Sequence, residues 1–597
     1  MVGFPYIRPM EFERLSKKSI QKTSERQRSR KILLFLYATL FGVAIIVVRL
    51  FYLQIHQGTH LCKLGERNFL RTEVIPSERG NVYDSEHRLL ATNRPVFDLR
   101  WYGSGAFSLA QDQRDFINKI RLILGAEVVD DLLEKQIERS ERFSRQLLVK
   151  SDITRDQLCK ISEQCAESQN LSIERRFKRI YPFNSLASHI LGYLRQARES
   201  HGVQGLYGLE RLFQDDLQGE TGYVQHVINA TGKKLFTAEQ KEAQAGSDVT
   251  LTLDLDMQKI AENLFSPGQS GAFIIMDPKD GAIKVMLSYP NFDPNLFLKP
   301  ISQEVWQNKF YTDSPLLNRA IHAAYPPASI FKLVTFTAGL EEGVITTETE
   351  FDCKGYTLFA GRKYNCQRRW GHGLQSAQKA LGVSCNIPCY EIAQQISIDQ
   401  LAVHAMRLGL GQSTGFLFHD KSGLVPTMGW KQAVHGERWW QGETLSVSIG
   451  QSSLLVTPLQ IVRMISAICS GYLVKPRILL DEEIIRYPLY VSQKTIEFLQ
   501  DVMGEVVKRG TAKRMKVFED FSIHAKTGTA QIVSLAKQKK GAKNQLEHAW
   551  FSSYFSYKNE KPLAMVVLVE NAGSSRPALK IAENFFKRYQ ELLREKE

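Results

Sequence analysis

The longest run of apolar side chains lies near the start of the chain. Residues 32–48 read ILLFLYATLFGVAIIVV, and the apolar character continues past Arg49 into LFYLQI. A run of this length can cross a bilayer, with the Arg49 charge extended towards the interface. A core helix would show a polar face and a signal peptide would end in small residues, and this segment does neither. The pattern predicts a transmembrane signal-anchor helix over residues 32–55.

After this helix the pattern changes to short alternations of apolar and polar residues around turn signals such as Arg79-Gly80-Asn81, which are typical of short β-strands. Residues 105–180 are charged and helix-forming, and residues 202–224 predict a helix punctuated by glycines. Strands and turns are expected from there to about Gly246. Residues 56–247 are therefore predicted to form an elongated, β-rich module without a catalytic cluster of its own.

A second domain is predicted over residues 248–597. Its clearest elements are a hairpin over 271–295 with Asp280-Gly281 at the turn, strands over 548–557 and 562–571, and an amphipathic terminal helix over 578–596. Strands at both ends with helical patterns between them predict an antiparallel sheet sandwiched by helices, beside an all-α part. The whole chain is thus expected to be an α+β multidomain protein.

Length and charge sharpen this organisation. A chain of 597 residues is too long for one hydrophobic core. Of the net charge of +14, residues 1–31 contribute nine Lys or Arg against three Glu. No finger spacing or basic helical stripe accompanies the charge, so we interpret it as a topology signal and expect no nucleic-acid binding. The positive-inside rule then makes residues 1–31 a cytoplasmic basic arm and places everything after residue 55 outside.

Three short motifs occur in order in the second domain: Ser329-x-x-Lys332, Ser384-x-Asn386 and Lys526-Thr-Gly528. The first is weak alone, because the same spacing also starts at Ser19, Ser376 and Ser534. Ser19 would be cytoplasmic, and Ser534 lies in a polar, loop-like stretch. Ser376 is helical and is not excluded.

Ser329 follows YPPA and opens an apolar helix, so its hydroxyl lies about one turn from the Lys332 amine. A nucleophile beside a base at a helix N-terminus is a plausible catalytic pair. The simpler interpretation is an N-cap serine, the commonest role of Ser at a helix start, and on that segment alone we favour the cap. The three ordered motifs reverse that preference.

Taken together, these motifs resemble the penicillin-recognising serine D,D-transpeptidases. Within them the chain is similar to the class B penicillin-binding proteins, and most to the elongation type, penicillin-binding protein 2. The resemblance covers nearly the whole chain. In the second domain it includes YPPAS, SIGQSSLLVTPLQ, KTGTAQ and HAWF. In the outer module, RGNVYD, LLATN and GLERLFQDDLQGETG resemble the pedestal of that class, and GYVQHVINATGKKL resembles the linker of the elongation type.

The resemblance implies a role for each matching residue. Ser329 would be the nucleophile and neutral Lys332 its base. Ser384 would relay a proton to the leaving amine, and Asn386 would hold the substrate amide and orient Lys332. Lys526, Thr527, Gly528 and Thr529 would form the subsite for the terminal carboxylate, and the N–H groups of Ser329 and Thr529 the oxyanion hole.

It also implies the setting. The substrates would be peptidoglycan stem peptides, with β-lactams as covalent inhibitors. The enzyme would lie in the bacterial inner membrane with its catalytic domain in the periplasm. It would need no organic cofactor. Its partners would be a separate SEDS glycosyltransferase of the RodA type and other elongation-complex proteins. The alternatives are a β-lactamase, a bifunctional enzyme with its own glycosyltransferase, and a non-catalytic scaffold or β-lactam sensor.

A cluster of possible metal ligands lies between the first two motifs. Cys353, Cys366, His372 and Cys385 fall within 33 positions. Outside the cytoplasm a Cys353–Cys366 disulfide is a common outcome, but three thiols and an imidazole make a structural zinc site competitive. Resemblance to zinc-carrying members of the elongation type supports His372 and Cys385 most directly. Asp352 could replace Cys353, and Cys389 is assigned to a helix core.

Overall fold

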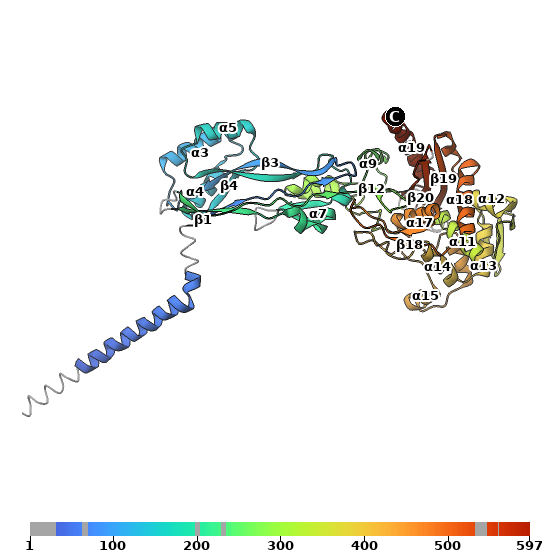
Figure 1. Ribbon diagram of the computed structural model, residues 1–597, viewed down its shortest axis with the longest axis horizontal. Coiled ribbons are helices and arrows are strands. Elements are labelled where there is room, and N and C mark those ends of the chain that lie inside the picture. The colour runs from blue at the N-terminus through green and yellow to red at the C-terminus, as the bar shows by residue number, and fades with distance from the viewer. Residues whose placement is uncertain (1–31, 62–69, 197–202, 229–233, 532–545, 559) are drawn as a thin grey trace, which may run out of the picture. The chain divides into compact units, whose positions relative to one another are not determined.

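The structure is a computed structural model that describes residues 32–61, 70–196, 203–228, 234–531, 546–558 and 560–597 (Figure 1). The predicted cytoplasmic arm, residues 1–31, lies outside these ranges. The described chain forms two compact units. The first contains residues up to 75, 99–173 and 221–242, and the second contains 76–98, 174–220 and 243–597. The predicted boundary at 247/248 stays a prediction, because these units group part of the outer module with the C-terminal domain.

The N-terminal helix spans Ile32–His56, contains an 18-residue stretch with a mean hydropathy of 2.4 and is the only helix in the described ranges that is long and apolar enough to cross a membrane. Its side chains are almost all exposed within the protein. An apolar helix without protein packing requires an apolar surrounding, because the transfer of such side chains into water is unfavourable. This finding agrees with the anchor predicted over residues 32–55.

Besides the N-terminal helix, the first unit contains a small antiparallel sheet and helices α3, α4 and α5. The sheet has the order β1-β8-β9. The charged segment 105–180 forms these three helices, in line with its helix-forming composition, and also strands β4 and β5. The elements are β1 (Leu70–Ile75), α3 (Gln111–Leu124), α4 (Asp131–Arg142), β4 (Gln146–Lys150), α5 (Arg155–Gln164), β8 (Gly222–Ile228) and β9 (Lys234–Lys241). Strands β8 and β9 confirm the extended structure expected before Gly246.

The segment predicted as one helix over residues 202–224 is different in the structure, so that prediction is wrong. It begins as strand β7 (Val203–Tyr207), continues as two one-turn helices, α7 (Gly208–Leu212) and α8 (Gln214–Gln218), and enters β8. Two causes interrupt the helix: residues 203–207 pair with β6 as a strand, and Gly208 and Gly219, at the start of α7 and after α8, have φ +62° and +66°. The left-handed region ends a helix, and glycine adopts it at little cost.

The remaining elements of the outer module include short strands and one long strand. The unit boundary falls within β3 and β5. The bounds are β2 (Val82–Tyr83), β3 (Leu89–Tyr102), β5 (Leu171–Ile180), α6 (Ser188–Leu191) and β6 (Tyr193–Gln196).

A buried ion cluster ties together three distant segments of the second unit. The Glu210 carboxylate accepts from Arg79 Nε at 2.6 Å, from Arg179 Nε at 2.8 Å and from the Tyr181 hydroxyl at 3.0 Å. Burial opposes ionisation of Glu210, but the two guanidinium groups outweigh it and lower the carboxyl pKa. Arg79 lies in RGNVYD and Glu210 in GLERLF, so the two motifs of the outer module meet in one structural contact.

The C-terminal domain is built on a five-stranded antiparallel sheet with the order β12-β11-β21-β20-β19. Its two faces enter different hydrophobic cores, because side chains alternate along each strand. Ile274 packs in the core that contains α17, whereas Phe273 and Ile275 pack in the core that contains α19. The bounds are β11 (Gly271–Met276), β12 (Ile283–Tyr289), α17 (Pro458–Ser470), β19 (Phe521–Ala530), β20 (His548–Tyr557), β21 (Leu563–Val569) and α19 (Arg576–Lys596).

The part of the sequence between β12 and β19 consists mainly of helices and short hairpins and forms the predicted all-α part (Figure 1). The fold class is therefore confirmed, including the helices on both faces of an antiparallel sheet. These elements are α9 (Leu255–Glu262), which precedes the sheet, and α11 (Lys332–Glu341), β13 (Glu350–Cys353), β14 (Tyr356–Phe359), β15 (Arg362–Asn365), β16 (Gly373–Ser376), α12 (Ala377–Gly382), α13 (Ile387–Gln395), α14 (Ile398–Arg407), α15 (Met428–His435), α16 (Gln441–Ser448) and α18 (Gln493–Lys508).

Candidate active site and thiol cluster

Ser329 does not cap a helix. It lies inside a 3-10 turn over Ala328–Ile330 whose N-cap is Pro327, and this turn continues into α11. Ser376, by contrast, is the N-cap of α12 and its hydroxyl accepts from Lys379 N. The cap interpretation thus fits Ser376 and not Ser329. Ser19 and Ser534 lie outside the described residues.

Lys332 is completely buried at the start of α11. Its Nζ donates to the Ser384 carbonyl oxygen and to Asn386 Oδ1, both at 2.6 Å, and lies 3.3 Å from Ser384 Oγ. Burial lowers the pKa of Lys332, and nearby thiols, first Cys389, act in the opposite direction. Desolvation favours the neutral amine that a general base requires.

The Ser384 hydroxyl lies between two buried lysines. Lys526 Nζ donates to Ser384 Oγ at 3.0 Å, and Lys332 Nζ lies 3.3 Å from the same oxygen. Burial, and then the charge of Lys332, hold the pKa of Lys526 well below its usual range. Two ammonium groups next to one hydroxyl repel each other, so their protonation is coupled and at most one is charged at low cost. The hydroxyl can pass a proton between them.

Ser384 has an unusual backbone conformation, with φ +61°. The left-handed region is strained for a residue with a side chain and persists only where the surroundings hold it. The neighbouring contacts do so, because both Lys332 and Gln367 donate to the Ser384 carbonyl oxygen. This conformation turns the Ser384 hydroxyl and carbonyl towards the lysines.

The third motif lies on β19, at the edge of the sheet beside Ser329. A Cβ atom at Gly528 would lie 3.2 Å from the Pro327 carbonyl oxygen and 3.4 Å from Ala328 Cβ, so any larger residue would have to displace the turn by a few tenths of an ångström. Thr527 Oγ1 is 2.6 Å from Thr511 Oγ1, on the loop after α18. Thr511 was not singled out from the sequence, and no local pattern marks it.

The three motifs open into one cavity of about 960 Å³. This volume lies near the upper end of the range of about 300–1,000 Å³ that is usual for ligand pockets. The cavity brings together the nucleophile, the proton relay and the β19 residues that we predicted for binding. Among its lining residues are Ser329, Ser384, Asn386, Thr527, Gly528 and Thr529. Lys332 and Lys526 lie buried behind this lining.

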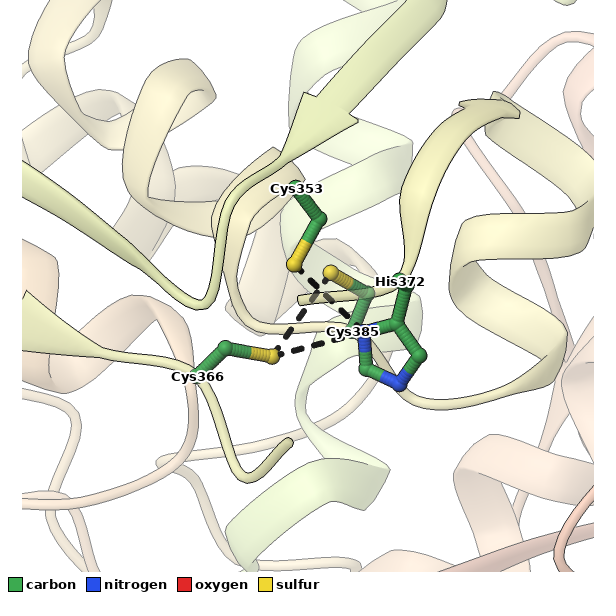
Figure 2. A group of neighbouring side chains, drawn as sticks. All are labelled: Cys353, Cys366, His372 and Cys385. Carbon is green, nitrogen blue, oxygen red and sulfur yellow. Dashed lines mark hydrogen bonds between the residues drawn. The ribbon is translucent and has the colours of Figure 1, made fainter. Parts of the chain in front are cut away.

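Figure 2 shows the four predicted metal ligands converging from separate segments. Their ligand atoms all lie within 4.8 Å of one another. His372 Nδ1 is 3.5 Å from Cys353 Sγ and 3.6 Å from Cys366 Sγ, and the sulfur atoms of Cys366 and Cys385 are 3.8 Å apart. All three cysteines are free thiols, so the structure contains no Cys353–Cys366 disulfide.

Three of the separations in the cluster have the lengths expected for a tetrahedral metal site. Bonds of about 2.3 Å to sulfur and about 2.0–2.1 Å to nitrogen require sulfur–sulfur edges of about 3.8 Å and sulfur–nitrogen edges of about 3.6 Å. The observed separations match both values. A hydrogen bond between Cys385 and Cys366 lowers the pKa of the Cys366 thiol to about 4 and raises that of Cys385. Without a cation, the buried sulfurs cannot all be thiolates.

Asp352 and Cys353, the two alternatives for the fourth ligand, differ in burial and in their contacts. Both lie on β13, where neighbouring side chains point to opposite faces. Cys353 is buried and contacts His372, whereas Asp352 is exposed and pairs with Lys354 at 3.5 Å. Cys389 lies on α13, fully buried, and does not join the four-residue cluster.

Comparison with known families gives two matches that together cover most of the chain. The penicillin-binding protein transpeptidase domain matches residues 271–591. The penicillin-binding protein dimerisation domain matches residues 74–251, the region where a bifunctional enzyme would carry its glycosyltransferase.

Single proteins and solved structures give the same result over nearly full length. The peptidoglycan D,D-transpeptidase MrdA of Haemophilus influenzae is 30% identical, with 92% of this chain and 90% of that protein covered. A complex between penicillin-binding protein PBP2 and MreC from Helicobacter pylori matches with a TM-score of 0.74 and 28% identity, covering 88% of this chain and 99% of that one. A chain from a peptidoglycan synthase complex, titled for its coordination of polymerization and crosslinking, matches with a TM-score of 0.70 and 29% identity, covering 94% and 97%.

Proposed function

Because the chain belongs to the class B penicillin-binding proteins of the penicillin-binding protein 2 type, we propose that its cavity cross-links peptidoglycan stem peptides through an acyl-enzyme on Ser329. The substrate class follows from the relatives named as peptidoglycan D,D-transpeptidases. The observation that carries the residue assignment is the chain of contacts Lys332–Ser384–Lys526 behind the cavity that Ser329 lines. The role in cell elongation comes from the same relatives.

In the first step Ser329 Oγ attacks the carbonyl carbon of the penultimate D-Ala. Neutral Lys332 takes the hydroxyl proton, because burial disfavours its charged form. The backbone N–H groups of Ser329 and Thr529 are the proposed oxyanion donors, a contribution of about 2.7–4 kcal/mol per donor in comparable enzymes. As the C–N bond breaks, the proton reaches the leaving D-Ala amine through the Ser384 hydroxyl.

In the second step the amine of a neighbouring stem peptide attacks the ester carbonyl. Its proton returns through Ser384 and Lys332 to Ser329 Oγ as the C–O bond breaks, so the enzyme is regenerated and one new amide is formed. Lys526, Thr527 and Thr529 bind the terminal carboxylate of the donor. A β-lactam that presents a carboxylate and a strained amide in the same arrangement would acylate Ser329 and stay bound.

A labelled penicillin tests this assignment. We expect wild-type protein to become covalently labelled and Ser329→Ala to show no label, because the attacking oxygen is removed. Ser376→Ala is the matched control: it removes a serine with the same Ser-x-x-Lys spacing that serves as a helix cap. The control should keep its labelling rate. Covalent label on Ser329→Ala would reject the nucleophile.

We also propose that Cys353, Cys366, His372 and Cys385 hold a structural Zn²⁺. The support is the donor set and its tetrahedral spacing. A site with four protein ligands has no open position for substrate, so the ion would supply coordination and not catalysis. Cys385 stands between Ser384 and Asn386, so its side chain would fix the backbone that carries the proton relay.

Metal analysis gives an independent test. Purified wild-type protein should contain about one zinc per chain, and Cys353→Ser should bind less and unfold at a lower temperature, because hydroxyl is a poor zinc ligand. Cys159→Ser, at an exposed thiol, should change neither value. Fully active protein without metal, carrying a Cys353–Cys366 disulfide by mass spectrometry, would contradict the proposal.

The surroundings of the enzyme are the last part of the proposal. We propose that the helix Ile32–His56 crosses the inner membrane with residues 1–31 in the cytoplasm, following the basic flank. A SEDS glycosyltransferase of the RodA type and other elongation-complex proteins are the proposed partners. The similar chains found with MreC and in a peptidoglycan synthase complex support assembly of this kind.

A further inference from the structure

The Asn386 side chain connects the base to the segment that carries the thiol cluster. On one side its Oδ1 accepts from Lys332 Nζ at 2.6 Å. On the other side its Nδ2 donates to the Asn365 carbonyl oxygen at 3.1 Å. Asn365 directly precedes Cys366, a member of the cluster. Each end of this amide therefore has a partner that accepts only one orientation.

The orientation matters for the base. A neutral lysine amine has two N–H bonds and one lone pair. The Ser384 carbonyl oxygen and Asn386 Oδ1, both 2.6 Å from Lys332 Nζ, can take the two N–H bonds and leave the lone pair for the nucleophile. If the Asn386 amide turned over, its NH₂ group would face the amine and one N–H of Lys332 would lose its 2.6 Å acceptor, leaving only the longer contacts of 3.3 Å to the Cys385 carbonyl oxygen and Ser384 Oγ.

Tyr390 supports the same carbonyl from α13. It lies four residues after Asn386, so both side chains project from one face of the helix start. Its hydroxyl donates to the Asn365 carbonyl oxygen at 3.3 Å and lies 3.5 Å from Asn386 Nδ2. The side chain is buried, and its ring packs edge-on against Tyr364. Tyr390 thus holds the Asn386 amide and its acceptor together.

Gln367 makes a second contact between the two segments. Its Nε2 donates to the Val383 carbonyl oxygen at 3.1 Å and to the Ser384 carbonyl oxygen at 3.4 Å. The Ser384 carbonyl is the other acceptor of the Lys332 amine. Gln367 is not one of the four clustered ligands. The two acceptors nearest to Lys332 Nζ are therefore held from the segment around Cys366 by groups that are not themselves metal ligands, whereas its longer contacts, to the Cys385 carbonyl oxygen and Ser384 Oγ, are both 3.3 Å.

We propose that Tyr390 and Gln367 are positioning residues for the acylation step, Tyr390 through the Asn386 amide and Gln367 through the Ser384 carbonyl. This inference rests on the proposed function, since it assigns their role to Lys332 as base. It differs from the zinc proposal because neither side chain is a ligand. Loss of either contact slows proton removal from Ser329 and leaves the cavity and the zinc site in place.

Acylation kinetics with a fluorescent penicillin test the positioning role of Tyr390. Stopped-flow or gel-based measurements give the binding constant and the acylation rate constant separately. We expect Tyr390→Phe to lower the acylation rate constant about 5- to 30-fold, the effect of one hydrogen bond in a buried network, with unchanged binding, zinc content and melting temperature. Tyr364→Phe is the matched control, because the Tyr364 hydroxyl donates to the Gly442 carbonyl oxygen instead. It should stay within about two-fold of wild type.

A double-mutant cycle separates positioning from general stability. In an Asn386→Ala background, Tyr390→Phe should have no further effect, because its target is gone. Gln367→Leu should lower the acylation rate constant in both backgrounds. The role of Tyr390 is rejected if wild type and Tyr390→Phe have equal acylation rate constants. It is also rejected if Tyr390→Phe lowers this rate constant by the same factor in both backgrounds. Unchanged acylation by Gln367→Leu overturns that of Gln367. Covalent label on Ser329→Ala would instead reject the proposed function itself.

Discussion

At the scale of single residues, burial without a charged partner decides several protonation states. Lys332 and Lys526 are two examples in the site, and Glu262 on α9 is one outside it. The Glu262 carboxyl accepts from Ala187 N at 2.9 Å, from Gln258 Nε2 at 2.9 Å and from Asn291 Nδ2. All three partners are neutral, and desolvation raises the pKa of Glu262 to about 7.

This pKa predicts a pH-dependent stability. The unfolded value is about 4.3, so the folded state holds more protons between about pH 4.3 and 7. The contribution of Glu262 is fully present below the unfolded pKa and is lost as the pH rises through 7. We expect Glu262→Gln to flatten the fall in melting temperature between pH 5 and 8, measured by calorimetry, even where the lost Asn291 contact lowers stability at every pH. Glu304→Gln, at an exposed position, is the control and should show the same change of melting temperature with pH as the wild type. The same pH dependence in Glu262→Gln as in the wild type would contradict the prediction.

At the scale of elements, the site depends on how closely β19 approaches the turn that carries Ser329. Gly528 faces the Pro327 carbonyl oxygen, and Gly450 makes a second close approach, because a Cβ there would lie 2.0 Å from the Ala328 carbonyl oxygen. Ala328 N donates to the Gly450 carbonyl oxygen at 2.9 Å. Two glycines thus let two separate segments hold one short turn, and they fix Ser329 relative to Thr529.

Gly528→Ala tests this packing. A methyl group at 3.2 to 3.4 Å from its neighbours must push the turn away by a few tenths of an ångström. We expect penicillin acylation to fall by a factor of about ten or more, because small displacements of reacting groups are costly. Gly429→Ala, in α15 with no contact closer than 3.9 Å, is the control and should acylate at the wild-type rate. Full activity in Gly528→Ala would show that the turn can move without consequence.

At the scale of the whole molecule, residues from distant parts of the chain meet in the part of the second unit that precedes the C-terminal domain. Arg79, Arg179 and Glu210 come from segments separated by about a hundred and by about thirty residues, and their ion cluster is buried. A buried charge network of this kind adds little net stability over apolar packing, but loss of one member leaves the others uncompensated.

Glu210→Gln should therefore be strongly destabilising. Two buried guanidinium groups would lose their carboxylate, and we expect a loss of about 3–5 kcal/mol in the free energy of unfolding, measured by urea denaturation. Glu583→Gln, a partly exposed surface pair with Lys580 at 3.4 Å, should cost less than about 1 kcal/mol. A loss in Glu210→Gln as small as that of the control would mean that water or other groups compensate the arginines.

The sequence by itself determined the features whose signals are local. A helix long enough to cross a membrane, the hairpin at Asp280-Gly281 and the terminal helix follow from apolar periodicity, because each element buries one face or none. The three motifs and the four clustered ligands also follow, since residue types and order suffice to find them. The helix over 202–224 failed because residues before Gly208 pair as a strand, a contact that no local pattern encodes.

Only the tertiary structure decided where residues that look equivalent in the sequence are placed. Ser329 and Ser376 share one spacing, and packing made the first a turn residue in the cavity and the second a cap. Cys353 and Asp352 are neighbours, and the face that β13 buries places the cysteine, not the aspartate, in the cluster with His372. The contacts of Tyr390, Gln367 and Thr511 join segments far apart in sequence, so their chemistry exists only after folding has brought a donor within reach of its acceptor.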